Sequence, residues 1–266
     1  MKMNPIEEYY GKFNEDKRLK SRHGLVEYRL SMKYIKEALE KIGADTGLAK
    51  EDIRILDLGA GTGAYSIPLA EEGYSVTAVE LVKHNLSRLK ARCKLVDAHV
   101  GDAMDLHKYP EASYDLVLIF GPMYHLFSHE DKLKVMNEVK RVAKDGAIIM
   151  VAYCMNEYSV VMYALKEKHL KECIDGGRLN ETFHTSSKIE DLYDYVRMED
   201  VDRLVEDSGF KRIKTVSPDG PTNYIRPVLK AMTEEEFEIY ISYVEAIAER
   251  QDLIGAAAHI IDILEK

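Results

Sequence analysis

The chain has 266 residues, of which 46% are hydrophobic and 31% are charged, and its formal net charge is −9. This balance is typical of a packed globular protein and excludes disorder over most of the chain. The acidic excess argues against a broad basic surface of the kind that follows a polyphosphate backbone. Nucleic acid is therefore not an expected partner.

No targeting or membrane segment is visible. Residues 1–16 are polar and acidic, without the apolar run of a secretory signal. The longest apolar runs, residues 116–120 and 147–155, are too short to cross a bilayer and fit buried strands. The three cysteines are widely spaced, which indicates neither a disulfide framework nor a zinc site. We expect a cytoplasmic protein with no membrane contact.

The first predicted element is an amphipathic helix over about residues 24–42, where Val26, Leu30 and Tyr34 recur at helical spacing. Short apolar stretches then alternate with helical ones. Strands are predicted over residues 53–58, 75–80, 94–100, 114–120 and 147–153, and helices up to Gly73 and over residues 85–93 and 128–143. Continuously apolar strands that alternate with helices indicate a parallel sheet covered on both faces, and right-handed crossovers favour a doubly wound topology.

The alternation stops after Tyr153. A helix is expected within residues 156–197, and others over residues 199–208 and 234–251. Further strands are predicted over residues 210–216 and 258–264. These helical segments are expected to embellish the sheet rather than to form a second domain.

Residues 55–63, Ile-Leu-Asp-Leu-Gly-Ala-Gly-Thr-Gly, form the most informative stretch. Its glycines permit a tight turn and close approach of a ligand to the backbone, and the next helix offers free N–H groups. The pattern is not specific, because Gly59-x-Gly61-x-x-Ala64 followed by Glu80 also fits the dinucleotide fingerprint of dehydrogenases. An NAD-dependent oxidoreductase therefore remains open at this point. Pro68, early in the following helix, predicts a late helix start or a mild kink.

Polar groups also follow the other predicted strands. Asp57 precedes the first glycine by two residues, Asp102 follows the third strand, and the fourth strand ends in Phe-Gly-Pro-Met-Tyr-His-Leu at residues 120–126. The carboxyl ends of parallel strands share one edge of a sheet, so these residues are expected to line one cleft.

Taken in this order, the segments resemble the motifs of class I S-adenosylmethionine-dependent methyltransferases. Residues 56–63 resemble the first motif, 78–80 the second and 101–103 the third, and residues 121–126 resemble a loop of the small-molecule subgroup. The resemblance implies an α/β, Rossmann-like fold. Its sheet would be seven-stranded and mostly parallel with a terminal antiparallel strand, helices on both faces and a helical lid or insertions.

The resemblance also implies one methyltransferase domain over residues 1–266. Its expected parts are an N-terminal lid and helix (1–50), a cofactor-binding core (51–153), helical embellishments (154–198 and 221–256) and a last strand (258–264).

S-adenosylmethionine is the implied cofactor and S-adenosylhomocysteine the product. In the family the glycine turn packs against the methionine part, the acid of the second motif accepts from the ribose hydroxyls, and the acid of the third accepts from adenine. The implied cofactor-binding residues are Asp57, Gly59, Ala60, Gly61, Gly63, Glu80, Leu81, Asp102, Ala103, Met104 and Phe120, with Tyr10 and Arg22 from the lid.

Candidates on the acceptor side are fewer. Tyr124 and His125, where the fourth strand opens into the cleft, and His23, in the lid, are candidate catalytic residues. Tyr124 is also a candidate substrate-binding residue, as is His184 in the insertion after the fifth strand. The structural alternatives are that His125 only caps or packs against the helix that begins near Ser128, and that the N-terminal segment is a solvated arm. His125 and His129 lie four apart, but without a third ligand no metal is expected.

The expected function is methyl transfer to a small-molecule acceptor by in-line displacement, with catalysis mainly by positioning and a base only if the acceptor must lose a proton. An RNA or protein methyltransferase, an NAD-dependent oxidoreductase and a non-catalytic cofactor-binding protein are the alternatives. The sequence does not identify the acceptor, and a monomer or a homodimer is expected.

Overall fold

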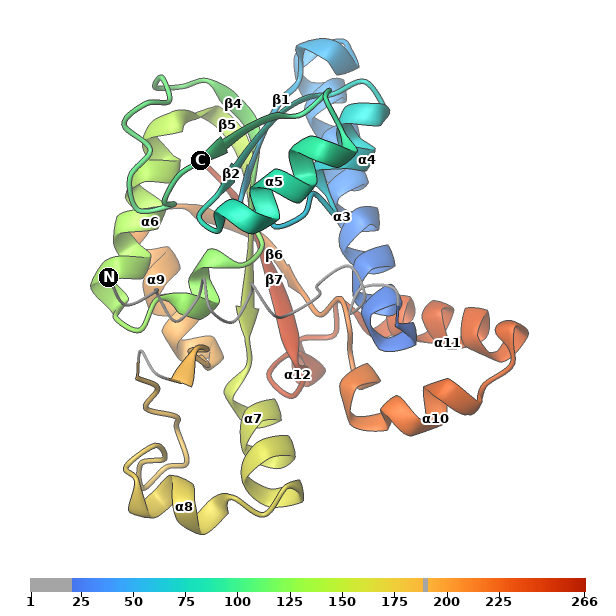
Figure 1. Cartoon of the computed structure of the whole chain (residues 1–266), viewed down its shortest axis with the longest axis vertical. Coiled ribbons are helices and arrows are strands. Elements are labelled where there is room, and N and C mark those ends of the chain that lie inside the picture. Colours follow the sequence, from blue (N-terminus) through green and yellow to red (C-terminus); the bar gives the residue numbers. More distant parts are fainter. Residues whose placement is uncertain (1–20, 189–190) are drawn as a thin grey trace.

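A computed structural model of the chain describes residues 21–188 and 191–266. Within these residues seven strands form one sheet in the order β3-β2-β1-β4-β5-β7-β6 (Figure 1). The strands are β1 (Arg54–Leu58), β2 (Ser75–Glu80), β3 (Asp97–Val100), β4 (Tyr114–Ile119), β5 (Ala143–Cys154), β6 (Lys211–Val216) and β7 (His259–Glu265). The predicted seven-stranded, mostly parallel sheet is confirmed.

The first five strands pair in parallel, whereas β7 lies between β5 and β6 and runs antiparallel to both. The predicted antiparallel last strand is therefore confirmed. It pairs with β5 as well as with β6, the strand before it. Because β7 runs in the opposite direction, its first residue, His259, pairs with Cys154 at the end of β5. The amino end of β7 thus meets the carboxyl ends of the parallel strands.

Helices cover both faces of the sheet, as Figure 1 shows. The helical segments are α3 (Arg22–Thr46), η1 (Lys50–Asp52), α4 (Ser66–Glu71), α5 (Lys83–Arg92), η2 (Pro122–His125), α6 (His129–Val142), α7 (Asn156–Ser159), the π-helical η3 (Val160–Lys166), α8 (Leu170–Asp175), α9 (Met198–Ser208), η5 (Thr222–Ile225), α10 (Arg226–Ala231), α11 (Glu234–Ile247) and α12 (Gln251–Ile254). One buried cluster joins the sheet to α3, α4, α5 and α11, and another joins it to α6 and α9.

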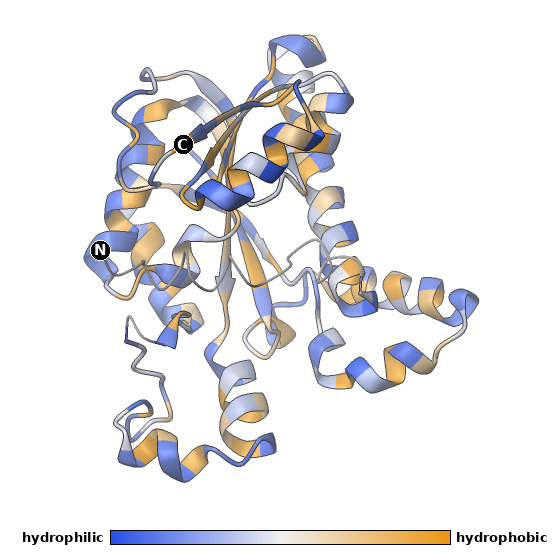
Figure 2. Cartoon of the chain, viewed as in Figure 1, coloured by the Kyte–Doolittle hydropathy of each residue, from blue (hydrophilic) through white to orange (hydrophobic). Residues whose placement is uncertain are grey.

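Alternate residues of the central strands supply these two clusters. Leu116 and Leu118 of β4 pack on the α3 side, whereas Val117 and Ile119 pack on the α6 side. Every residue of β4 is buried, as expected for a strand covered on both faces. Figure 2 shows the same pattern, with largely hydrophobic central strands and helices that carry both kinds of residue. No helix in the described residues is long and apolar enough to cross a membrane.

Several boundaries can be compared with the sequence-based expectation. β5 begins at Ala143 instead of Ala147. A turn is expected at Gly146, but there the pairing of β5 with β4 only shifts its register, so the strand continues through it. β3 begins three residues later than predicted, at Asp97. The helix after the glycine turn begins at Ser66, so Pro68 falls in its first turn, where backbone N–H groups have no helical partner. The predicted late start is confirmed.

The helical insertions leave the sheet at the edge where the cavity opens. One follows β5 as α7, η3 and α8, and the other follows β6 as η5, α10 and α11, so both project beyond the carboxyl ends of the parallel strands (Figure 1). Because the insertions have little sheet to pack on, their positions depend on contacts with distant parts of the chain.

The glycine turn generates a stability prediction. Gly63 has a φ of +89°, and a Cβ atom there would lie 2.8 Å from Ile67 and 3.0 Å from Leu89. We expect Gly63→Ala to lower the free energy of unfolding by about 1–3 kcal/mol in urea denaturation, because both strain and overpacking oppose it. Gly43→Ala is the control, since Gly43 lies within α3 with nothing within 4 Å of its Cβ position. Equal destabilisation by both changes would contradict the packing role of Gly63.

Candidate active site

A cavity of about 810 Å³ lies at the carboxyl edge of the sheet. Its volume is within the range of sites for small molecules and cofactors. The glycine turn and the loops after β2, β3 and β4 form one part of its lining, and residues from α3, α7, α10 and β7 form another. The predicted cleft along the strand ends is therefore present.

The glycine turn lines the cavity through Gly59, Ala60, Gly61 and Thr62. At Gly59 a Cβ atom would lie 2.7 Å from Cδ of Pro122, so the turn and the loop after β4 approach too closely for a side chain. Gly63 is not part of the lining and serves the packing described above. Three of the predicted turn residues thus face the cavity, and Gly63 supports them.

Asp57 is buried beneath the turn and still reaches the cavity. The Ser66 hydroxyl, at the start of α4, donates a hydrogen bond to its carboxylate. Burial raises the pKa of Asp57 to about 6, an effect that the Ser66 hydrogen bond opposes and the charge of Glu80 reinforces. Asp57 therefore connects β1 to α4 and places negative charge under the turn.

Glu80, at the end of β2, is held in place by backbone groups on both sides. Its Oε2 accepts the Gly61 N–H at 2.7 Å, and its Oε1 accepts the Val82 N–H at 2.7 Å. Burial raises the pKa of Glu80, while these hydrogen bonds act in the opposite direction. The Asn85 side chain also hydrogen-bonds to this carboxylate, so a fixed acceptor faces the cavity.

Asp102 lies at the carboxyl end of β3, two residues after the strand ends. Its Oδ1 accepts the Met104 N–H at 2.9 Å, which turns the loop back toward the cavity. The other predicted cofactor residues of this region also line the cavity: Leu81, Ala103, Met104 and Phe120. Two oriented carboxylates with apolar side chains beside them suit a nucleoside, whose ribose and base offer hydroxyl and amino donors around an apolar ring.

The predictions for the three residues of the expected N-terminal lid have different outcomes. Tyr10 lies outside the described residues. His23 lines the cavity and shares a hydrogen bond of 3.0 Å between Nδ1 and the Ser21 hydroxyl. Arg22 does not line the cavity: Nη1 donates to the Leu229 carbonyl at 2.9 Å and to the Met232 carbonyl at 2.6 Å. The position of Arg22 thus does not support the expected cofactor contact, because the side chain fastens α3 to α10.

Tyr124 and His125, from η2, both line the cavity. Nδ1 of His125 donates to the Leu192 carbonyl at 2.8 Å, and its ring lies 5.3 Å from that of Tyr193. Burial lowers the pKa of His125, with the Leu192 carbonyl opposing the effect, so the ring is neutral at pH 7. The Ser128 side chain caps α6, so the structural alternative of His125 as cap does not apply.

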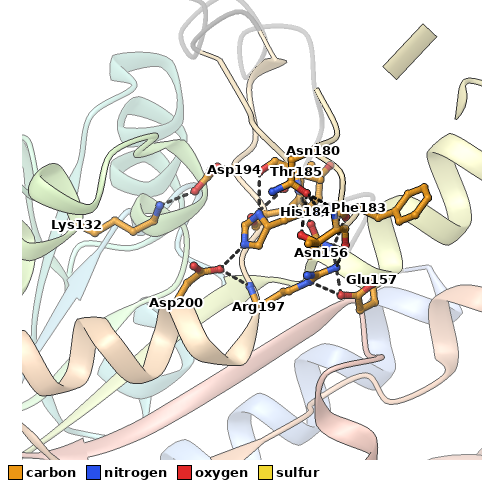
Figure 3. A network of polar contacts seen from close by, with 12 residues as sticks. Lys132, Asn156, Glu157, Asn180, Phe183, His184, Thr185, Asp194, Arg197 and Asp200 are labelled. Atoms are coloured by element: carbon orange, nitrogen blue, oxygen red, sulfur yellow. Dashed lines mark hydrogen bonds and ion pairs between the residues drawn. The ribbon is translucent and has the colours of Figure 1, made fainter. Parts of the chain in front are cut away.

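His184 lies elsewhere. It lines a separate cavity of about 260 Å³, and Figure 3 shows it within a polar network between the insertion after β5 and α9. Its Nε2 donates to Asp200 at 2.7 Å and its Nδ1 to the Thr185 carbonyl at 2.9 Å. Burial alone would lower the pKa of His184, but these two acceptors raise it. The expected contact of His184 with the acceptor is thus not supported, because the side chain holds the insertion in place.

Sequence reasoning missed a cluster at the opposite end of the large cavity. Nδ1 of His259 donates to Asp219 at 2.7 Å and lies 3.8 Å from Oε2 of Glu27. Asp219 is fully buried and also accepts from the Asn223 side chain at 2.8 Å. Glu27 and His259 line the cavity. The three come from α3, the loop after β6 and the start of β7, so no local motif joins them.

These three residues are also close enough to be considered as cation ligands. Their ligand atoms all lie within 4.8 Å of one another, which is true of no other trio of such residues among those described. However, Asp219 already accepts hydrogen bonds from the side chains of His259 and Asn223 and, at 3.3 Å, from the His259 backbone. Hydrogen bonding within the protein therefore accounts for the arrangement. His125 and His129 do not join it, and His129 pairs with Asp207 at 2.8 Å.

The comparisons with known proteins agree with the fold. Residues 55–146 match the model of the methyltransferase domain family. The chain is 26% identical over 69% of its length to a glycine/sarcosine/dimethylglycine N-methyltransferase of Actinopolyspora halophila, and the match spans 37% of that enzyme. It is 24% identical over 76% of its length to the tRNA N(3)-cytidine methyltransferase METTL2 of Danio rerio, spanning 67% of that enzyme.

The solved structure of an S-adenosylmethionine-dependent methyltransferase from Archaeoglobus fulgidus superposes with a TM-score of 0.57 at 19% identity, over 97% of this chain and all of that chain. The sheet order, the glycine turn and the acids at successive strand ends define a Rossmann-like fold with a candidate nucleoside site at its carboxyl edge. The family match places a methyltransferase domain at residues 55–146 of this fold.

The position of Arg22 leads to a prediction that separates stability from cofactor binding. Besides its two carbonyl contacts, Arg22 pairs with Glu234 and lies 4.9 Å over the Phe237 ring. We expect Arg22→Met to lower the free energy of unfolding by about 1–3 kcal/mol in urea. S-adenosylmethionine affinity, measured by calorimetry, should stay within about twofold, because the removed contacts all lie outside the cavity.

Arg29→Met is the matched control, since Arg29 of α3 pairs with the exposed Glu238 of α11. Its expected cost is below about 1 kcal/mol. A large loss of affinity in Arg22→Met with little change in stability would instead restore the role of Arg22 in cofactor binding.

Proposed function

We propose that the chain transfers a methyl group from S-adenosylmethionine to a small-molecule acceptor by in-line displacement. The observation that carries this proposal is the single cavity: the glycine turn with Glu80 and Asp102 lines one end, and His259 and Tyr124 line the other. Both reactants would then meet within one enclosure. Catalysis would come mainly from holding them in line and excluding water.

The lining fits the cofactor. Glu80 would accept from the ribose hydroxyls, and its pre-set position means that little ordering is required on binding. Asp102 would accept from the adenine amino group, with Ala103 and Met104 beside the ring. Gly59 and Gly61 would let the methionine part approach the backbone. When bound, S-adenosylmethionine supplies an activated methyl group, so the protein need not form a covalent intermediate.

Two observations favour a small acceptor. The cavity of about 810 Å³ must hold both reactants, which leaves room for only a compact acceptor beside the cofactor. The relative from Actinopolyspora halophila is named for methylation of glycine, sarcosine and dimethylglycine. A second candidate, methylation of RNA, is favoured by the similarity to the tRNA enzyme of Danio rerio. The net charge of −9 opposes it.

Calorimetric titration tests the cofactor assignment. We expect S-adenosylmethionine to bind and Glu80→Gln to weaken it by about 10–100-fold, because hydrogen bonds to a charged group are worth about 1.5–3 kcal/mol. Glu51→Gln, a change of the same kind in the exposed η1 segment, should leave binding unaltered. Tighter binding of NAD than of S-adenosylmethionine would instead indicate the oxidoreductase.

A methylation assay tests the acceptor class. Formation of S-adenosylhomocysteine is measured with a panel of small amines and phenols and, separately, with total tRNA. We expect turnover with at least one small molecule and none with tRNA, whose recognition requires a basic surface. Methylation of tRNA with a steep dependence on salt would overturn the small-molecule proposal and support the RNA enzyme.

A further inference from the structure

We propose that His259 is the general base of the reaction, that Asp219 is its positioning residue, and that the methyl acceptor is a small amine. This inference rests on the proposed methyl transfer and specifies the end of the cavity that the cofactor does not fill. It depends on where the two ring nitrogens of His259 lie and on the charges around them.

The ring of His259 has one nitrogen engaged and one directed at the cavity. Nδ1 donates to Asp219, and the described residues provide no hydrogen-bond partner for Nε2. In the described part of the chain, the Tyr153 hydroxyl is the one fully buried side-chain polar atom without a partner, so Nε2 is not sealed inside the protein. With His259 in the lining and 22% of its side chain exposed, Nε2 is accessible from the cavity.

Asp219 makes this orientation rigid. The carboxylate is fully buried and receives hydrogen bonds from the Nδ1–H and backbone N–H of His259 and from the Asn223 side chain. Because Asp219 accepts from Nδ1–H, the neutral ring carries its lone pair on Nε2. An imidazole held in this tautomer by a buried carboxylate is arranged to take a proton and to remain stable once it has done so.

The charges around His259 favour a cationic acceptor. Glu27 from α3 and Asp219 from the loop after β6 are both close to the ring, so two carboxylates flank one imidazole. Arg226, at the start of α10, is a cation of the same lining, and Asn223 accepts from its Nε at 2.9 Å and from its Nη2.

The remaining titratable neighbours among the described residues carry thiol and phenol groups. They are Cys154 on β5, Tyr158 on α7 and Tyr124 on η2, whose ring lies 6.3 Å from that of His259. Aromatic faces and carboxylates together attract an ammonium group.

The proton balance can be written completely. The ammonium group of the acceptor gives one proton to Nε2 of neutral His259, leaving a neutral amine with a free electron pair. This pair forms the new N–C bond while the C–S bond of the cofactor breaks and its electron pair stays on sulfur. His259 ends protonated, with its positive charge stabilised by Asp219 and Glu27, and returns the proton to solvent.

The surroundings of His259 also bring its proton affinity closer to that of the acceptor's ammonium group. Burial alone would lower the pKa of His259, but electrostatic interactions with Glu27, Cys154 and Asp219 and the Asp219 hydrogen bond raise it well above its ordinary value. A base with raised proton affinity is suited to an ammonium, which holds its proton more tightly than imidazolium normally does. Since only the neutral ring accepts a proton, kcat should rise with pH through the pKa of His259 and then level off.

The experiment compares His259→Asn with wild type, using glycine, sarcosine and dimethylamine as amine probes and catechol as a phenol probe. We expect kcat for the methylated amine to fall about 10²–10⁴-fold and its rise with pH to disappear, with S-adenosylmethionine affinity unchanged. Added imidazole should partly restore turnover in His259→Ala. His99→Asn is the matched control, because His99 lies on β3 outside the cavity and pairs with Asp97.

Two further variants test the positioning role. Asp219→Asn keeps the shape but removes a carboxylate that stabilises protonated His259, so the rise in kcat should move to lower pH and its plateau should fall. Glu27→Gln should also move the rise to lower pH. Circular dichroism monitors whether Asp219→Asn folds. If loss of the buried charge prevents folding, Glu27→Gln still reports the shift in the pH at which kcat rises.

The outcomes separate this inference from the function on which it rests. Absence of S-adenosylmethionine binding would overturn both. Amine methylation with a normal rate and pH profile in His259→Asn would overturn only the assignment of the base. Methylation of catechol but of no amine would overturn the acceptor class. Activity that EDTA abolishes and a divalent cation restores would show that the cluster holds a metal instead of moving a proton.

Discussion

The shared direction of β1, β2, β3 and β4 is the constraint on which the rest of the structure depends. Parallel pairing brings the carboxyl ends of these strands to one edge, so the residues that follow each strand meet there although they are far apart in sequence. The contact between Gly59 and Pro122 expresses this constraint most directly, because it closes two of these loops together with no room for a Cβ atom. The cavity is a consequence of that geometry.

Carboxylates at this edge are prepared before any ligand arrives. Asp57 and Glu80 are buried, and their raised pKa values show that the charged forms are maintained at some cost. The hydrogen bonds from Ser66, Gly61 and Val82 offset part of that cost. A site held in this way binds its ligand with little rearrangement. The same principle applies at the other end of the cavity, where Asp219 holds His259.

Local patterns predicted the elements and the residues that line the cavity beside the glycine turn. The glycine turn and the acids at residues 80 and 102 lie at or just after the carboxyl ends of strands, so their positions follow from the sheet itself. Arg22 and His184 show where this reasoning stops. Both were assigned from their place in the sequence, yet Arg22 contacts carbonyls at the end of α10, and His184 pairs with Asp200 of α9. Neither partner is indicated by a local pattern.

The sequence by itself determined the doubly wound sheet, the antiparallel last strand and the edge where the cavity lies, because apolar periodicity and the short motifs after the strands carry that information locally. Only the tertiary structure decided the composition of the cavity around His259. Glu27, Asp219 and His259 come from three distant segments, and they meet because α3 packs across the sheet and β7 enters it in the reverse direction. Contacts that depend on the docking of an insertion and on strand order have no signature in a short stretch of sequence.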